Sequence, residues 1–152
     1  MAIKLATGLT VSSIAFSQGG HIPKKYSCEG ENINPPLEIS RFPKETKTLT
    51  IIVEDPDAPR GIFDHWLAWN LSPNEPISEN YIGGVSGRNS FGNIGYGGPC
   101  PPSGSHRYYF KVYALDSNLN LPEGSDKKQL LDAMQGHVIT TGELMAHYKK
   151  GG

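Results

Sequence analysis

The sequence lacks the features that would place it among membrane or nucleic-acid-binding proteins. No run of about 18 apolar residues occurs, which excludes a transmembrane helix. The 14 basic and 15 acidic residues are mixed along the chain, so we expect neither a nucleic-acid stripe nor a polybasic membrane patch. No basic start followed by an apolar segment marks a signal peptide, and we therefore expect a cytoplasmic protein.

Cysteine is also scarce, because Cys28 and Cys100 are the only two in the chain. Disulfides persist mainly in oxidising compartments, so for a cytoplasmic protein we expect two reduced thiols. Whether the two cysteines pair stays open, since a bridge requires Cα atoms within about 7 Å.

Several motifs of known catalytic sites are missing as well. The chain has no His-x-x-x-His or Cys-x-x-Cys spacing for a metal and no Gly-x-Ser-x-Gly turn for a nucleophilic serine. We therefore expect no metal, no cofactor and no catalytic residue of these types.

Glycine and proline, in contrast, are abundant. The 18 glycines and 12 prolines make about a fifth of the 152 residues, against the usual ~12%. Apolar segments are spread over the whole chain, so this composition indicates many turns in a folded protein. We expect one loop-rich β domain over residues 1–152.

Alternating and β-branched segments predict the strands. The strongest are Thr48–Glu54, His65–Leu71 and Arg107–Leu115, and shorter ones are expected at Leu9–Phe16 and Leu37–Ile39. In Arg107–Leu115 the side chains of Tyr108, Phe110, Val112 and Ala114 would share one face.

One helix is expected, from Ser125 as N-cap to Met134, with Gly136 as its stop. The last segment, His137–Lys150, fits either a strand or a helix. The run Thr140-Thr141-Gly142 has low helix propensity and favours the strand.

Candidate functional side chains occur in three segments that a β fold could bring together. Asp55 and Asp57 follow the strongest strand, and on an extended chain their carboxylates would lie on one side. His65 begins the next strand, and His106 with Tyr108 follows the glycine- and proline-rich segment Ser86–Ser105, which we interpret as a binding loop. Taken singly, the acids also fit ordinary turn chemistry and the histidines ordinary packing.

Together these segments carry a family resemblance. Asp-Pro-Asp-Ala-Pro at 55–59, His-Trp-Leu-Ala-Trp-Asn at 65–70 and Gly-Tyr-Gly-Gly-Pro-Cys-Pro-Pro at 95–102 with His-Arg-Tyr at 106–108 resemble the signature regions of the phosphatidylethanolamine-binding protein family. That family includes the Raf kinase inhibitor proteins. The residues at 28–30, 34–36 and 98–102 resemble those of its compact bacterial and archaeal branch.

The resemblance implies a mainly β fold, an antiparallel Greek-key β-sandwich with one or two short helices. It also implies a small cavity for phosphate-like or carboxylate-like anions, and a cis proline at Pro56 or within Pro101-Pro102. By motif position the ligand-binding residues would be Asp55, Asp57, Pro59, His65, Gly98, Pro99, His106 and Tyr108.

A physical argument refines these roles. An anion beside two aspartates is repelled unless a positive charge compensates, so we hypothesise that Asp55 orients and charges one histidine. Tyr108 and the backbone N–H of Gly98 would donate to the ligand. Arg107 would point to the opposite face and pair with an acid.

Two functions remain open, beside a third possibility in which the protein is structural and its pocket vestigial. The first is a small-anion-binding protein, for phosphate or a phosphorylated headgroup, that regulates a protein partner such as a serine protease or a kinase. The alternative is an enzyme that uses the Asp/His pocket for acid–base or metal-assisted hydrolysis. A homodimer is left open, with Tyr109 and Tyr113 either in the core or between subunits.

Overall fold

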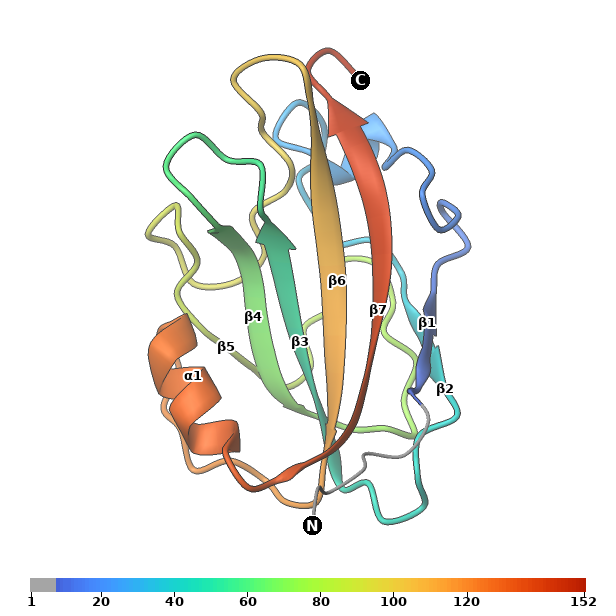
Figure 1. Cartoon of the computed structure of the whole chain (residues 1–152), viewed down its shortest axis with the longest axis vertical. Helices are drawn as coiled ribbons and strands as arrows, with labels where there is room; N and C mark the ends of the chain where they lie inside the picture. Colours follow the sequence, from blue (N-terminus) through green and yellow to red (C-terminus); the bar gives the residue numbers. More distant parts are fainter. Residues whose placement is uncertain (1–7) are drawn as a thin grey trace, which may run out of the picture.

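The computed structural model describes residues 8–152, and within them the chain is mainly β, as expected from the sequence. The first seven residues of the expected domain lie outside the described part. The elements are β1 Thr10–Ser12, the 3₁₀ helix η1 Lys24–Tyr26, β2 Glu38–Ser40, β3 Thr48–Asp55, β4 Phe63–Leu71, β5 Val85–Ser86, β6 Ser105–Leu115, α1 Lys127–Met134 and β7 Val138–Lys149 (Figure 1).

All strand pairs are antiparallel, and they form two sheets. The larger sheet has the order β5-β4-β3-β6-β7, and the smaller one pairs β1 with β2. Strands β3, β4 and β5 are consecutive, and β6 then returns to lie beside β3. This order is a Greek key, which confirms the expected topology.

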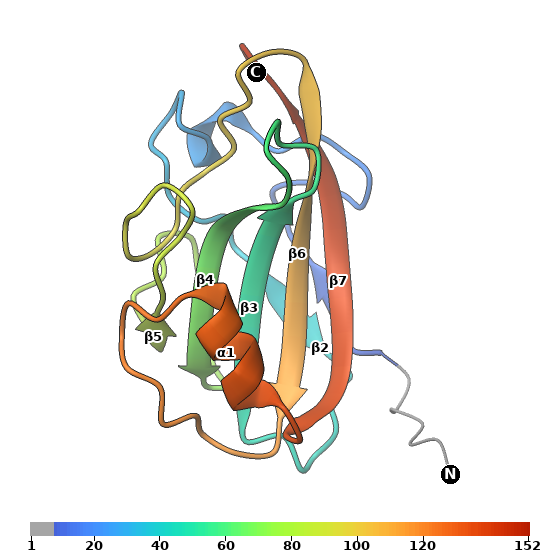
Figure 2. The ribbon, with the colours of Figure 1, turned by 60° about the vertical axis from the view of Figure 1, so that its left-hand side comes forward.

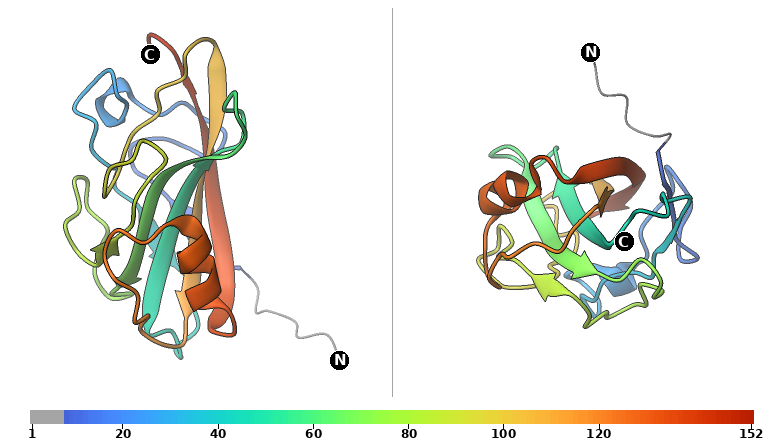
Figure 3. Two further views of the ribbon diagram at one scale, coloured as in Figure 1. Left: turned by 90° about the vertical axis from the view of Figure 1, so that its left-hand side faces the viewer. Right: turned by 90° about the horizontal axis from the view of Figure 1, so that it is seen from below.

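The large sheet is covered on both faces. One face packs against β1, β2 and the loops around them, and the other packs against α1 (Figures 2 and 3). Every residue of β3 is therefore buried, which explains why its apolar residues fall on both faces of the strand. Leu49, Ile51 and Val53 belong to the first core, and Ile52 belongs to the second.

Strand β6 shows the predicted alternation. Tyr108, Phe110, Val112 and Ala114 are fully buried on the first core, while Tyr109, Lys111 and Tyr113 are only partly covered on the opposite face.

The ambiguous last segment is strand β7, paired with β6 along its whole length. Gly142 is required there for a packing reason, because a Cβ at this position would collide with the carbonyl oxygen of Leu9. The free edge of β7 is covered by the N-terminal region: Leu9 N donates to Thr141 O at 3.1 Å and Ile22 N donates to His147 O at 2.8 Å. The long edge strand is thus protected from pairing with another chain.

Helix α1 begins one residue later than predicted. Its N-cap is Asp126, whose carboxylate accepts from Gln129 N, while the Gln129 side chain accepts from Asp126 N. This reciprocal capping box satisfies two backbone donors, whereas Ser125 Oγ donates to Pro122 O. The helix ends as predicted, with Gly136 at φ 84°.

The short strands differ most from the sequence prediction. The expected strand Leu9–Phe16 pairs only over β1, because Ser13 Oγ accepts from Ala15 N and turns the chain. Strand β5 is not among the strands predicted from the sequence. None of the helices in the described part of the chain has the length and apolar character needed to cross a membrane.

Candidate functional site

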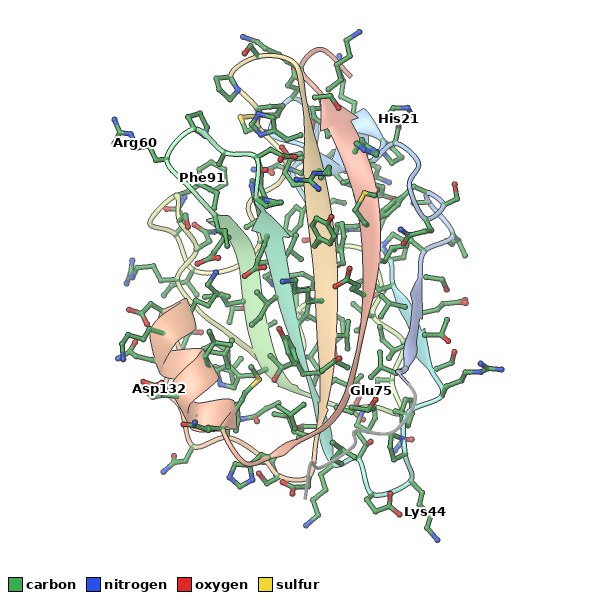
Figure 4. All side chains as sticks on the ribbon, in the orientation of Figure 1. His21, Lys44, Arg60, Glu75, Phe91 and Asp132 are labelled. Atoms are coloured by element: carbon green, nitrogen blue, oxygen red, sulfur yellow. A yellow bond between two sulfur atoms is a disulfide. The ribbon has the colours of Figure 1, made fainter. Side chains whose placement is uncertain are left out.

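A small cavity opens at the end of the sheet where β3 and β4 are joined. Its volume is about 130 Å³, below the ~300–1,000 Å³ of cavities for drug-sized ligands, so it suits an ion or a compact group. Figure 4 shows Phe91 and Arg60 at this end of the molecule, with Lys44 and Glu75 at the opposite end. The lining residues are Asp55, Ala58, Pro59, Phe63, His65, Phe91, Cys100, Pro101, Pro102 and His106.

Asp55 and His106 form the buried polar pair of this cavity. Asp55 is the last residue of β3 and His106 the second residue of β6, two neighbouring antiparallel strands. His106 Nδ1 lies 2.6 Å from Asp55 Oδ2, and the side chains are 11% and 4% exposed. The carboxylate accepts, so Nδ1 carries the proton and Nε2 is left for a ligand. The expected pairing of Asp55 with a histidine is therefore present, and its partner is His106.

His65 is held in the same way by a backbone carbonyl. Its Nδ1 lies 2.7 Å from Gly97 O, which can only accept, so again Nε2 is the nitrogen left for a ligand. Burial lowers the pKa of His65, and the Gly97 carbonyl and the Asp55 charge oppose that shift without cancelling it. His65 is thus a neutral acceptor at pH 7 and is not the histidine that Asp55 was expected to orient.

Tyr108 lies between the two imidazoles without lining the cavity. Its ring centroid is 5.2 Å from that of His65, edge to face, and 6.5 Å from that of His106, stacked. The hydroxyl is buried and makes no hydrogen bond of acceptable geometry within the described residues. Burial raises the pKa of Tyr108 and the nearby Asp55 carboxylate raises it further, so the phenol keeps its proton.

Asp57 turns away from the cavity, contrary to the expectation that its carboxylate lies beside that of Asp55. Asp55 Oδ1 accepts from Asp57 N at 2.8 Å, and this turn ends the extended chain. The Asp57 carboxylate then accepts from Arg107 Nε at 2.9 Å and Arg107 Nη2 at 2.8 Å. The Arg107 guanidinium lowers the pKa of Asp57 to about 2. This pair, the one expected for Arg107, fastens the β3–β4 loop to β6.

Gly98 and Pro99 are held against a neighbouring loop instead of facing a ligand. Gly98 N donates to Asn32 Oδ1 at 2.7 Å. The prediction that this N–H donates to an anion is therefore wrong. A Cβ at Gly98 would collide with the carbonyl oxygen of Tyr26, which is why glycine is needed here. Pro99 O accepts from Cys28 N at 3.0 Å.

The next residue is covalently tied to the same loop. Cys28 and Cys100 form a disulfide, with Cα atoms 5.4 Å apart, and the prediction of two reduced thiols is wrong. The sequence could not show this pairing because the two cysteines lie 72 residues apart and meet only through the fold. The predicted cis proline is also wrong, since all peptide bonds of the described residues are trans.

Two phenylalanines, Phe63 and Phe91, complete the cavity. Phe63 and Phe91 contact each other edge to face at 4.6 Å between centroids, and each contacts the ring of His65. Phe91 could have been suspected as the lone phenylalanine of a glycine-rich segment. Pro101 and Pro102, although part of the motif, were not expected to form the wall.

Comparison with known proteins identifies the relatives of this chain. The family model described as phosphatidylethanolamine-binding protein matches residues 12–149. A UPF0098 protein of Archaeoglobus fulgidus is 48% identical over 156 residues, covering 97% of this chain and 53% of the relative, so the chain spans about half of that protein. A second UPF0098 protein, from Pyrococcus horikoshii, is 51% identical over 93% of this chain and 77% of its own length.

Two solved structures have the same fold. The crystal structure of a phosphatidylethanolamine-binding protein homologue from Chlamydia trachomatis matches with a TM-score of 0.90 and 50% identity, over 95% of this chain and 99% of that one. Escherichia coli YbcL, described as a member of the mammalian family, matches with a TM-score of 0.85 and 30% identity, over 94% and 99%.

Proposed function

Because the chain belongs to the phosphatidylethanolamine-binding protein family, we propose that it binds a small phosphate-like anion in the Asp55–His106 cavity. The observation that carries this proposal is the fixed orientation of two buried imidazoles. Both Nδ1 atoms are occupied by acceptors, Gly97 O and Asp55 Oδ2, so both rings offer Nε2 to a ligand.

The two rings would play different parts. The Asp55 carboxylate accepts from Nδ1 of His106 and lies within the same cavity, so we infer that His106 is the ring that donates from Nε2 when an anion enters, with Asp55 balancing the charge. His65 is neutral and accepts, so it would take a hydrogen bond from a protonated oxygen of the ligand. The pair therefore fits an acid phosphate or a phosphomonoester that carries both O⁻ and OH. Pro59 and the two phenylalanines would surround its substituent.

A phosphate titration followed by NMR on the histidine side chains tests this proposal. In the wild type, phosphate should shift the signals of His65 and His106 together, and His106→Ala should abolish saturable binding. His21→Ala is the matched control, because His21 is exposed and lies outside the cavity. Shifts at His21 and His65 of equal size, without saturation, would contradict a specific site.

Regulation of a protein partner is the second part of the proposal. Phe91 lines the cavity and is 43% exposed, and Ile62 on the β3–β4 loop is 59% exposed. Apolar side chains beside an anion site suit a surface whose partner is controlled by the ligand. A serine protease or a kinase is the partner class that the family suggests. Inhibition assays with and without phosphate, on wild type and Phe91→Ser, test this part.

The enzyme alternative rests on one observation, the Asp55–His106 pair, whose geometry is that of an oriented general base. The cavity lining contains no serine or threonine, and its cysteine is in a disulfide. Hydrolysis would therefore need an activated water. Release of nitrophenol from a nitrophenyl phosphate, lost in His106→Ala, would establish this alternative in place of simple binding.

Location and assembly remain predictions. The cytoplasmic location predicted from the sequence can be tested by cell fractionation. The homodimer can be tested by ultracentrifugation of wild type and Tyr109→Ser, because Tyr109 lies partly exposed on the outer face of β6.

A further inference from the structure

The Cys28–Cys100 disulfide joins the cavity to a separate part of the fold. Cys100 is one of the lining residues, whereas Cys28 lies outside the lining. Both cysteines are exposed residues, so a reductant can reach the bond without unfolding of the core. Most structural disulfides are protected by burial, and exposed ones are more readily exchanged.

The two ends of the disulfide are anchored very differently. On the Cys28 side, Ser27 Oγ bonds the hydroxyl of Tyr148 at 2.9 Å. Glu29 accepts from the same hydroxyl and from Gly151 N at 2.9 Å. Cys28 is thus flanked on both sides by residues fixed to the end of β7.

On the other side, Cys100 is followed by Pro101 and Pro102, which have no N–H to donate. The segment before it is well held, through Gly98 and Pro99. After it, the hydrogen bonds made within residues 8–152 come from a single residue near the C-terminus: Lys150 Nζ donates to Pro102 O at 3.1 Å and Lys150 N donates to Gly104 O at 2.9 Å. The disulfide therefore holds the cavity wall formed by residues 100–104, which has few backbone hydrogen bonds of its own.

We propose that the Cys28–Cys100 disulfide is a reversible redox site that controls the anion cavity. A dithiol reductant opens it, and opening it releases the wall formed by residues 100–104 and weakens anion binding. The effect on anion binding rests on the proposed function, whereas the release of the wall does not.

The redox step is ordinary thiol–disulfide exchange. A thiolate of the reductant bonds to one cysteine sulfur, and the S–S bond breaks with its electron pair on the other sulfur. The second thiol of the reductant, as its thiolate, then attacks the reductant's own sulfur in the mixed disulfide. The reductant leaves as an intramolecular disulfide, and the first cysteine is released as a thiolate. Two electrons pass to the protein, and protonation gives two thiols, with that of Cys100 at the cavity.

The first experiment measures opening and its local consequence. Native protein is incubated with dithiothreitol, free thiols are counted by alkylation and mass spectrometry, and amide hydrogen exchange is compared between the two states. We expect both cysteines to be alkylated while the amides of β3 and β6 stay protected, with faster exchange at the amide of Lys150, whose acceptor Gly104 O lies in the released wall. Reduction only together with loss of protection in β3, or unchanged exchange at Lys150, would overturn the proposal.

The second experiment measures phosphate affinity in the two redox states. Reduction should raise the dissociation constant about 5-fold or more, the lower range of energetic coupling between sites. The double variant Cys28→Ser/Cys100→Ser is the control, and dithiothreitol should leave its affinity unchanged at the weaker value. Equal affinities of oxidised and reduced wild type would refute control of the cavity. No phosphate binding even by oxidised protein would refute the proposed function, while hydrogen exchange still decides on the release of the wall.

Discussion

Two adjacent acids on β3 illustrate two ways in which this protein stabilises a buried charge. Asp55 points into the cavity and pairs with one imidazole, His106, at 2.6 Å. Glu54 points to the opposite face of the sheet, where Lys111 Nζ lies 2.8 Å and Lys127 Nζ 2.7 Å from its carboxylate. Lys127 also reaches Asp64, the residue opposite Glu54 on β4, at 2.7 Å.

The difference lies in the cations. The lysines are permanently charged at physiological pH, so Glu54 and Asp64 are neutralised within the fold and nothing is left for a ligand. Burial alone would raise the pKa of Glu54, but hydrogen bonds from Lys111 and Lys127 outweigh it and hold that pKa below the usual range. An imidazole instead changes its charge near neutral pH and keeps a free Nε2. The Glu54 cluster, which consists of Glu54, Asp64, Lys111 and Lys127, therefore stabilises the fold, whereas the Asp55–His106 pair can respond to a ligand.

The largest expected effect comes from removing the covalent link on the cavity side. Cys28→Ser/Cys100→Ser frees a loop closed over 72 residues, which should lower the free energy of unfolding by about 2–4 kcal/mol. The melting temperature should fall by roughly 10 °C. Calorimetry with and without reductant measures both. Because the Glu54 cluster does not involve this link, Glu54→Gln should destabilise the double serine variant as much as the wild type.

Glu54→Gln attacks the structural cluster itself. The substitution leaves Lys111 without its carboxylate, while Lys127 keeps Asp64, and we expect a loss of about 2 kcal/mol of stability. Urea unfolding measures it. Phosphate affinity should not change, because this side chain faces away from the cavity.

Lys128→Gln is the matched control for that prediction. Lys128 forms only an exposed pair with Asp132 on α1, and its loss should cost about 0.5 kcal/mol or less. A Glu54→Gln protein as stable as the control, or one with altered phosphate affinity, would show that the two clusters are not separate as argued.

Asp55→Asn tests the responsive pair. The amide oxygen can still accept from His106 Nδ1, but the hydrogen bond is no longer charge-assisted and no negative charge balances a donating Nε2, so phosphate binding should weaken about 10-fold at pH 7. Isothermal titration over a range of pH measures this change. An Asp55→Asn protein that binds phosphate as tightly as the wild type at every pH would contradict the assigned role.

The two clusters should also separate in an acid titration. The folded-state pKa of His65 lies below its value in the unfolded chain, so unfolding takes up a proton and stability falls as the pH drops below about 7. Glu54 has a lowered folded-state pKa, so its contribution is lost only below about pH 4.5. Urea unfolding at pH 7, 6, 5 and 4 resolves the two steps. His65→Asn should remove the upper step alone, and persistence of that step would assign it to another group.

The sequence predicts the regular parts of this molecule well and the contacts between loops poorly. Strands β3, β4 and β6 follow from apolar runs that are local and strong, and even the doubtful β7 follows from its Thr-Thr-Gly. In the site, the motif positions of Asp55, His65 and His106 do meet at one cavity. The partners of Gly98 and Cys100 could not be deduced, because Asn32 and Cys28 lie in another loop whose position only the packed fold determines.

Among the acids, the smallest expected effect concerns Asp57, which sequence spacing placed beside Asp55. Its carboxylate pairs with Arg107 on the outside of β6, where solvent screens the pair, so Asp57→Asn should cost only about 0.5–1 kcal/mol at pH 7. With a folded-state pKa of about 2 against 3.8, this contribution is complete above pH 4 and disappears as the pH falls to 2. Acid-titrated urea unfolding of wild type and variant should therefore converge near pH 2. Phosphate affinity within twofold of wild type is expected at pH 7, and a loss as large as that of Asp55→Asn would place Asp57 in the ligand site after all.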